Sequence, residues 1–361
     1  MITSGSPRTL LLLSAVAAAS APSCLPVAKA PSQVAKTHLG AGARQLQAGH
    51  LDQAEAHFAV AAEYSPRAAQ AYNGLGLVAL ARGERGRAAA LFQRAVHLDG
   101  DLAEARNNLG VLWLSRGRAA EAAGHFRAAL DVDPGYHQAR FNLSRALHEM
   151  GDLPGARQEL LKVTAVRPQD AAVWSALALI NVDLGLRAAA GEAIRRAAAL
   201  RPGSPEALVA QGALARANGD LASALRAHEE ARRLDPGDLS LRMQLGLTLL
   251  ASGRDAEARR EFGRVLAGRP FSARAHFAMG VLAARRMDLQ SAAKAFGRTR
   301  ELEPAFHAAY LQEAAAHLGL GRLGPARAAC QALRASPGRP QELLKRCKAL
   351  LASPGLRSGK S

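Results

Sequence analysis

The stretch YNGLGLVALARG, residues 72–83, decides the fold of this 361-residue chain. It contains Gly74-x-Gly76-x-x-Ala79, a spacing with which many dinucleotide-binding proteins hold a pyrophosphate. A second Gly-x-Gly begins at Gly40 in HLGAGARQLQAG, residues 38–49, so the two copies start 34 residues apart. An interval of this length is typical of repeat proteins, whereas a pyrophosphate site needs a strand before the glycines and a helix that opens at them. We therefore expect these glycines inside a helix, at a point where neighbouring helices approach closely.

The 34-residue interval recurs along most of the chain without an insertion. Each unit has an alanine in register, a turn-forming glycine five residues earlier in eight of nine units, and a helix-ending proline twelve residues later in seven. Met287 replaces the glycine in the eighth unit. Between these marks the apolar residues recur at helical spacing, so the sequence predicts nine helix-turn-helix units. The aligned alanines are Ala54, Ala88, Ala122, Ala156, Ala190, Ala224, Ala258, Ala292 and Ala326.

Composition independently favours an all-α fold. Aromatic residues make up 4% of the chain although 49% is hydrophobic, so the core must consist mainly of Ala, Leu and Val. Small side chains allow close packing of helices, whereas β-sandwiches draw on β-branched and aromatic residues. No stretch approaches the roughly 20 apolar residues of a mature transmembrane helix.

The repeat resembles the tetratricopeptide repeat from Ala35 to Pro340. This resemblance implies an all-α, right-handed superhelical solenoid of antiparallel helix pairs. Leu160, Ile194, His228 and Cys330 replace the aromatic residue of the second helix, and we expect looser packing in those units. The matching residues are Tyr72, Trp174 and Tyr310 at the first aromatic position, Leu75-Gly76, Leu109-Gly110, Leu245-Gly246 and Met279-Gly280 at the Leu-Gly pair, and Phe58, Phe92, Phe126, Phe262 and Phe296 at the second aromatic position.

A capping helix and a frayed tail are predicted for residues 341–361, because the last unit of a solenoid needs a polar outer face. The segment QELLKRCKALL has apolar residues on one side and charged residues on the other. Cys330 and Cys347 are expected at the joint between the last unit and this cap. Two alternatives remain for them: a disulfide, which persists in an oxidising compartment, or two small core residues.

His228 is expected to be a core residue rather than a metal ligand. No other ligand-type residue shares a helical face with it at metal-binding spacing. Walker, HExxH, CxxC and GxSxG patterns are absent as well. We therefore expect no catalytic residue, no metal and no cofactor.

Residues 1–30 are predicted to be a secretory signal, since Arg8 precedes an apolar run and small residues suitable for cleavage follow. Cys24 leaves two alternatives open. Ser23 fits a lipidation box but Pro22 and Ala21 do not, so the mature protein is either anchored by a lipid on Cys24 or exported without an anchor. In both cases we expect a bacterial protein of the periplasm or the outer-membrane-associated cell envelope.

The resemblance implies that the first helix of each unit lines a concave groove for a peptide or helix of a partner protein. Asn108 and Asn142 resemble the asparagine ladder with which the repeats of O-linked N-acetylglucosamine transferases grip a peptide backbone, because an amide both donates and accepts hydrogen bonds. The alternative is that they are merely solvated. The predicted groove residues are Asn73, Asn107, Asn108, Phe141, Asn142, Arg145, Gln244, Arg274, Phe277, Arg285 and Gln312.

Charge is distributed unevenly along the chain, whose net charge is +17. Residues 35–238 hold 24 Lys and Arg against 22 Asp and Glu, whereas residues 239–361 hold 21 against 8. The basic C-terminal third suggests an acidic protein or an anionic polymer, such as an exported polysaccharide, as an alternative partner. Nucleic acid is less favoured, because export and scarce aromatic residues both argue against it. The sequence thus predicts a protein-interaction scaffold that assists assembly of an envelope complex.

Overall fold

The computed structural model describes residues 31–336 and 341–352, and the predicted signal, Cys24 and the tail lie outside them. These described residues form nineteen α-helices without a strand. None of these helices is long and apolar enough to cross a membrane. The helices are α1 (Gln33–Gln47), α2 (Leu51–Tyr64), α3 (Ala69–Ala81), α4 (Arg85–Leu98), α5 (Ala103–Ser115), α6 (Ala119–Val132), α7 (His137–Met150), α8 (Leu153–Val166), α9 (Ala171–Asp183), α10 (Arg187–Leu200), α11 (Pro205–Ala217), α12 (Leu221–Leu234), α13 (Leu239–Ala251), α14 (Asp255–Gly268), α15 (Ala273–Arg285), α16 (Leu289–Leu302), α17 (His307–Gly319), α18 (Leu323–Ala335) and α19 (Gln341–Ala352).

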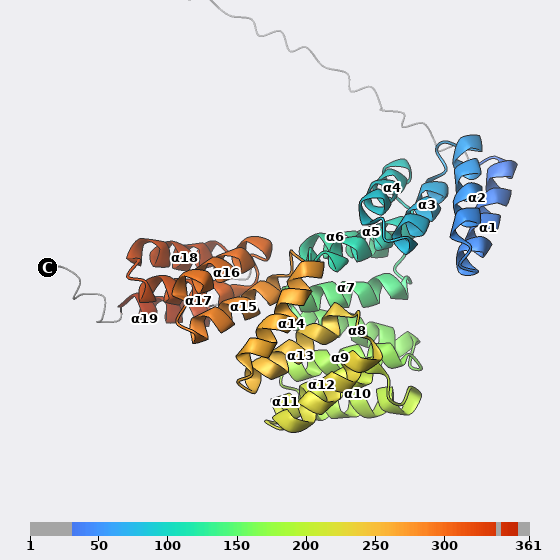
Figure 1. Ribbon diagram of the computed structural model, residues 1–361. Helices are drawn as coiled ribbons and strands as arrows, with labels where there is room; N and C mark the ends of the chain where they lie inside the picture. The colour runs from blue at the N-terminus through green and yellow to red at the C-terminus, as the bar shows by residue number, and fades with distance from the viewer. Residues whose placement is uncertain (1–30, 337–340, 353–361) are drawn as a thin grey trace, which may run out of the picture.

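Helices α1 to α18 form nine antiparallel pairs that stack in chain order, so the predicted all-α solenoid is confirmed. We call the odd-numbered helix of each pair, from α1 to α17, an A helix and the even-numbered one a B helix. Each B helix contacts the A helix of its own pair, and each from α2 to α16 also contacts the A helix of the next pair. Figure 1 shows α1 to α4 at one end of the solenoid, α15 to α19 at the other, and the central pairs between them.

A close contact between a ring and a glycine joins the two helices of a pair. A Cβ atom added to Gly76 of α3 would lie 2.5 Å from the ring of Phe92, and one added to Gly110 of α5 would lie 2.6 Å from Phe126. A carbon atom at such a distance would overlap with the ring, so the A helix needs glycine where the B helix carries an aromatic residue. The glycines of the opening stretch therefore serve helix packing.

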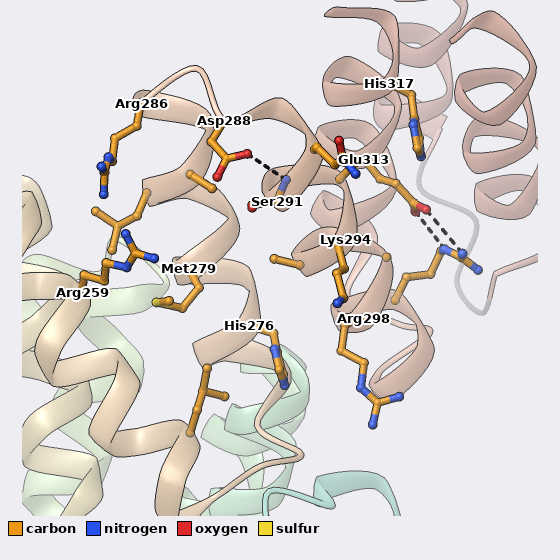
Figure 2. A pocket seen from close by; sticks show the side chains of 18 of the residues that line it. Arg259, His276, Met279, Arg286, Asp288, Ser291, Lys294, Arg298, Glu313 and His317 are labelled. Atoms are coloured by element: carbon orange, nitrogen blue, oxygen red, sulfur yellow. Dashed lines mark hydrogen bonds and ion pairs between the residues drawn. The ribbon is translucent and has the colours of Figure 1, made fainter. Parts of the chain in front are cut away.

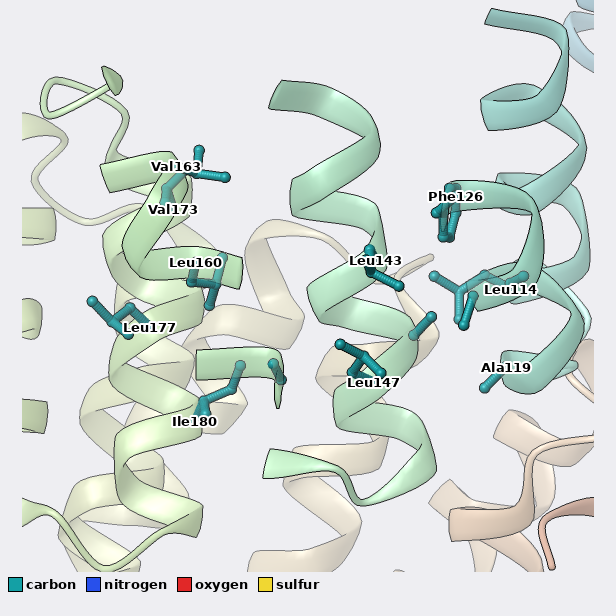
Figure 3. Close-up of a cluster of buried hydrophobic side chains, with 14 residues drawn as sticks. Leu114, Ala119, Phe126, Leu143, Leu147, Leu160, Val163, Val173, Leu177 and Ile180 are labelled. Atoms are coloured by element: carbon teal, nitrogen blue, oxygen red, sulfur yellow. The ribbon is translucent and has the colours of Figure 1, made fainter. Parts of the chain in front are cut away.

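Units without the ring also lack the glycine sixteen residues earlier. Leu160, Ile194 and Cys330 stand opposite Ser144, Ala178 and Ala314, respectively. The smaller B-helix side chain leaves room for a Cβ atom on the A helix. Leu160 is fully buried, so the unit keeps a closed core without the ring. Figure 3 shows Leu160 of α8 in a cluster that extends from α5 and α6 through α7 to α9.

The glycine after each A helix adopts a left-handed backbone conformation, with φ between 71° at Gly321 and 85° at Gly219. Met287 takes the same conformation, with φ 59°, and is the one described non-glycine residue with a positive φ. Its side chain is 75% exposed, so packing does not compensate for the strain. For an L-residue this conformation costs roughly 1–2 kcal/mol.

We expect Met287→Gly to raise the free energy of unfolding by about 1 kcal/mol, because glycine adopts a positive φ without steric cost. Urea-induced unfolding followed by circular dichroism measures this change. Met287→Ala is the control, since it removes the exposed thioether but keeps the Cβ atom. An equal gain from both substitutions would show that the backbone conformation is not the cause.

His228 replaces the aromatic ring in the sixth pair and is fully buried, as expected of a core residue. Its Nε2 lies 3.2 Å from the carbonyl oxygen of Val209, and its Nδ1 lies 2.9 Å from the hydroxyl of Thr248. Burial, together with the positive charge of Arg216, lowers the pKa of His228 from 6.5 to about 4. The folded protein therefore keeps this imidazole neutral where an unfolded chain would protonate it.

Acid should destabilise the fold through His228. Between pH 6.5 and pH 4 the unfolded chain binds a proton that the folded chain does not, so stability falls as the pH drops, by about 3 kcal/mol at most. In His228→Phe this loss should disappear, and the Thr248 hydroxyl can donate to the Gln244 carbonyl oxygen, 3.1 Å away. Unfolding of both proteins across this pH range tests the prediction, which fails if their stability difference does not change with pH.

The C-terminal cap is α19, which packs against α17 and α18. A disulfide joins Cys330 of α18 to Cys347 of α19, with 5.8 Å between their Cα atoms. Leu343, Leu344, Leu350 and Leu351 lie against the same cluster of buried residues. The charged residues of α19 face solvent, so this helix has the polar outer face that the end of a solenoid requires.

Candidate functional site

The predicted asparagines form two hydrogen-bonded pairs on the A helices. Asn108 donates to Asn73 and Asn142 donates to Asn107, each at 2.9 Å, so each bond links consecutive pairs of the solenoid. Asn107 and Asn142 are only 4% and 3% exposed, whereas Asn73 and Asn108 are half-buried. In this structure the amides thus hold neighbouring A helices together, and only the first pair also presents surface to the concave side.

Apolar side chains accompany this first asparagine pair on the concave side. Leu39 of α1, Leu77 of α3 and Val111 of α5 all remain half-buried. Leu77 and Val111 occupy the same position of consecutive repeats, and Leu39 occupies the position one helical turn earlier in the first repeat. All three pack only partly against the core. The first three pairs therefore leave a concave surface of apolar residues interrupted by two amides.

Further along, the chain itself closes the concave side. The turn between α14 and α15 lies against the turn between α5 and α6, where the Phe271 amide donates to the Arg116 carbonyl oxygen at 3.2 Å. A Cβ atom on Gly117 would lie 2.4 Å from the Ser272 nitrogen. Helix α15 also contacts α7, four pairs earlier in the solenoid. Repeats three to eight thus curl until their ends meet.

Arg274 of α15 provides the charged part of this closing contact. Its guanidinium lies 3.1 Å from Nε2 of His148 and 3.8 Å from the carboxylate of Asp183. Nε2 of His148 also lies 2.6 Å from that carboxylate. Burial disfavours ionisation of Asp183, but the hydrogen bond from His148 and the charges of Arg274 and Arg216 hold its pKa below the ordinary value. One carboxylate therefore joins α7, α9 and α15.

Arg145 and Gln244 lie within the closed region. Arg145 is exposed, and desolvation by the surrounding protein together with the charge of Arg269 lowers its pKa. Gln244 is buried, and its Oε1 lies 3.5 Å from the guanidinium of Arg216. Gln244 is therefore not available to a partner, whereas the Arg145 side chain has solvent access.

The other predicted residues are mostly engaged within the solenoid. Phe277 packs on Phe296 and Phe306, with ring centroids 5.3 and 4.9 Å apart, and Phe141 packs against the cluster of Figure 3. Arg285 donates to the Leu250 carbonyl oxygen at 2.7 Å and pairs with Asp255. Gln312 is exposed. The predicted residues therefore do not form one continuous groove.

His148 and Asp183 are the residues that sequence reasoning missed. Both lie near the C-terminal ends of A helices, at positions that face the concave side in this fold. The available signal was the Asp183 carboxylate, because a carboxylate on a packed helix face needs a partner. Among the described residues, no group of three or more His, Cys, Asp and Glu could hold a metal ion.

We expect Arg274→Ala to open the superhelix, because it removes the cation that bridges Asp183 and His148. Small-angle X-ray scattering should then report a larger radius of gyration with unchanged helical content. Arg285→Ala is the matched control, since Arg285 lies on the same helix but bonds only to the preceding pair. An unchanged radius in Arg274→Ala would mean that the backbone contact of Phe271 suffices to close the superhelix.

Comparison with known families identifies the repeats. Two family models, both described as tetratricopeptide repeat, match residues 114–180 and 215–282 and residues 39–103 and 79–137, respectively. Together these matches cover more than half of the chain. A search of curated proteins finds no match.

Solved structures share the fold at low sequence identity. Pseudomonas aeruginosa pilF is 21% identical with a TM-score of 0.50, and the match covers 59% of this chain and 97% of that one. PilW, described as a widely conserved type IV pilus biogenesis factor, is 21% identical with a TM-score of 0.50, over 60% of this chain and 99% of that one. A chain of the APC/C hetero-tetramer Cut9-Hcn1 is 14% identical with a TM-score of 0.56, over 92% and 73%, respectively. These similarities concern the helical solenoid alone.

Proposed function

The chain belongs to the tetratricopeptide repeat family, and from this premise we propose that it is a scaffold whose first three repeats bind a segment of a partner protein. Proteins of this family generally act as non-enzymatic scaffolds, and we assign no reaction to the chain. The observation that carries the proposal is the half-buried apolar surface of α1, α3 and α5, beside the amides of Asn73 and Asn108. Apolar anchors with a few polar groups suit a helix or an extended peptide.

The closed central repeats restrict where the partner lies. Because the α14–α15 turn meets the α5–α6 turn, a segment longer than a few residues cannot pass along all nine A helices while that contact holds. The partner segment is therefore short, or it leaves the concave side after the third repeat. Lys36 of α1 and Gln70 of α3, each three residues before Leu39 and Asn73, respectively, are exposed to solvent.

We further propose that this scaffold acts in the bacterial cell envelope and assists assembly of an envelope complex. The support is the predicted secretory signal in residues 1–30, with Cys24 as a potential lipid anchor. Mass spectrometry of the mature N-terminus distinguishes an acylated Cys24 from an unmodified exported chain. PilW is described as a pilus biogenesis factor, and a pilus assembly role is one form that the proposal can take here.

Photo-crosslinking in the native envelope tests the proposed surface. A photoreactive amino acid in place of Leu77, on the concave face of α3, should give a discrete crosslinked product with a partner protein. The same group in place of Ala90, exposed on the B helix of the same repeat, is the matched control.

Crosslinks of equal yield and identity at both positions would contradict binding on the concave face. A second substitution strengthens the test: Asn73→Ala with Asn108→Ala should reduce the Leu77 crosslink severalfold, because the amides no longer hold the partner backbone. Circular dichroism of this variant must show unchanged helicity, since the same pair also joins α3 to α5.

A further inference from the structure

A cleft of about 1340 Å³ lies on the B-helix side of the solenoid, between the seventh and eighth repeats. Helices α14, α15 and α16 form most of its wall, and residues of α17 line one end, as Figure 2 shows. The junction of α14 with α15 beside it is less extensive than most contacts between a B helix and the next A helix. The helices that line this cleft are not those of the concave surface of α1, α3 and α5. The inference therefore does not depend on the function proposed above.

The wall of this cleft carries three cations that form no ion pair among the described residues, although two of them act on the Asp288 carboxylate at longer range. Arg259, Arg286 and Lys294 are exposed, and within the described residues none of the three forms an ion pair. The carboxylates nearby are already engaged. Asp288 caps α16 by accepting from the Ser291 amide at 3.1 Å, and the three others in the wall each pair with an arginine.

The floor of the cleft is apolar, and one end holds a polar atom without a partner. Met279, Leu282 and Ala283 of α15 face the cavity together with Leu266 of α14. Nδ1 of His317 is buried and has no hydrogen-bond partner in the part of the chain that the structure describes. A ligand for this site therefore needs an apolar side for the floor and negative charges for the wall.

We propose that this cleft binds an acidic amphipathic helix of a partner protein. Such a helix has apolar residues along one face, which cover α15, and carboxylates along its flanks, which meet Arg259, Arg286 and Lys294. A helix as long as α14, 14 residues, spans about 21 Å and runs along the cleft between α14 and α16.

Other occupants fit these observations less well. Residues 1–30 contain Arg8 and Lys29, and residues 353–361 contain Arg357 and Lys360, without a single Asp or Glu side chain in either segment. Both segments thus carry charges of the same sign as the wall. An acidic polysaccharide would match the charge, but it offers no apolar face for Met279 and its neighbours.

Fluorescence anisotropy with a defined probe tests the proposal on the processed full-length protein. The probe is a labelled 14-residue peptide, the length of α14, with Leu on one helical face and Glu on the other. We expect it to bind at least about tenfold more tightly than a scrambled peptide of the same composition. Alginate, an acidic polysaccharide, and polyglutamate are the competitors without an apolar face.

Substitutions in the cleft locate the binding. Replacing Arg259, Arg286 and Lys294 together by Gln should weaken peptide binding at least about tenfold, and Met279→Glu should weaken it similarly through the floor. All of these side chains lie at the cavity surface, and circular dichroism checks that the variants fold.

A matched control replaces Arg67, Arg127 and Arg195 by Gln. These arginines are also exposed and form no ion pair among the described residues, but they lie outside the cleft. Equal loss of binding in the control and cleft variants would overturn the proposal, as would binding of alginate or polyglutamate as tight as that of the amphipathic peptide. Failure of the amphipathic peptide to bind the unmodified protein more tightly than the scrambled one would overturn it too.

Discussion

The contact of a B-helix ring with an A-helix glycine sets the geometry on which the rest of the structure depends. It brings two helix axes so close that a single Cβ atom would overlap with the ring, as at Gly110 and Phe126. Where the ring is missing, Ser144 and Ala178 replace the glycine opposite Leu160 and Ile194. A larger A-helix residue thus stands opposite a smaller B-helix residue, so the combined volume of the two side chains stays similar. This keeps the nine pairs in one register although their side chains differ.

Because each pair packs mainly against its neighbours, small differences between junctions accumulate along the solenoid. The weak junction of α14 with α15 and the close packing of α9 on α11 are two such differences. The accumulated curvature of these junctions decides whether α15 approaches α7. Arg274 then finds Asp183 across a separation of ninety-one residues, a contact that no single repeat specifies.

This distinction explains what the sequence could predict. The helix pairs, the turn glycines, the buried His228 and the polar cap each depend on residues within one or two repeats, and the repeat pattern placed them correctly. The groove was predicted by assuming that equivalent positions stay equivalent, so Asn142 was grouped with Asn108 although one is buried and the other half-buried. Closure by Arg274 and the cleft beside Arg259 depend on curvature, which varies between junctions and has no local signature.

The two proposed surfaces suit chemically different segments, and α15 links the cleft to the contact that closes the concave side. The concave face of the first repeats is apolar with amides, whereas the cleft has an apolar floor and a cationic wall. Helix α15 carries Met279 on the floor of the cleft and Arg274 in the contact that closes the superhelix. A partner helix bound between α14 and α16 would therefore contact α15, the helix whose Arg274 closes the concave side. If insertion shifts α15, closure and occupancy of the cleft are thermodynamically linked, and the linkage acts equally in both directions.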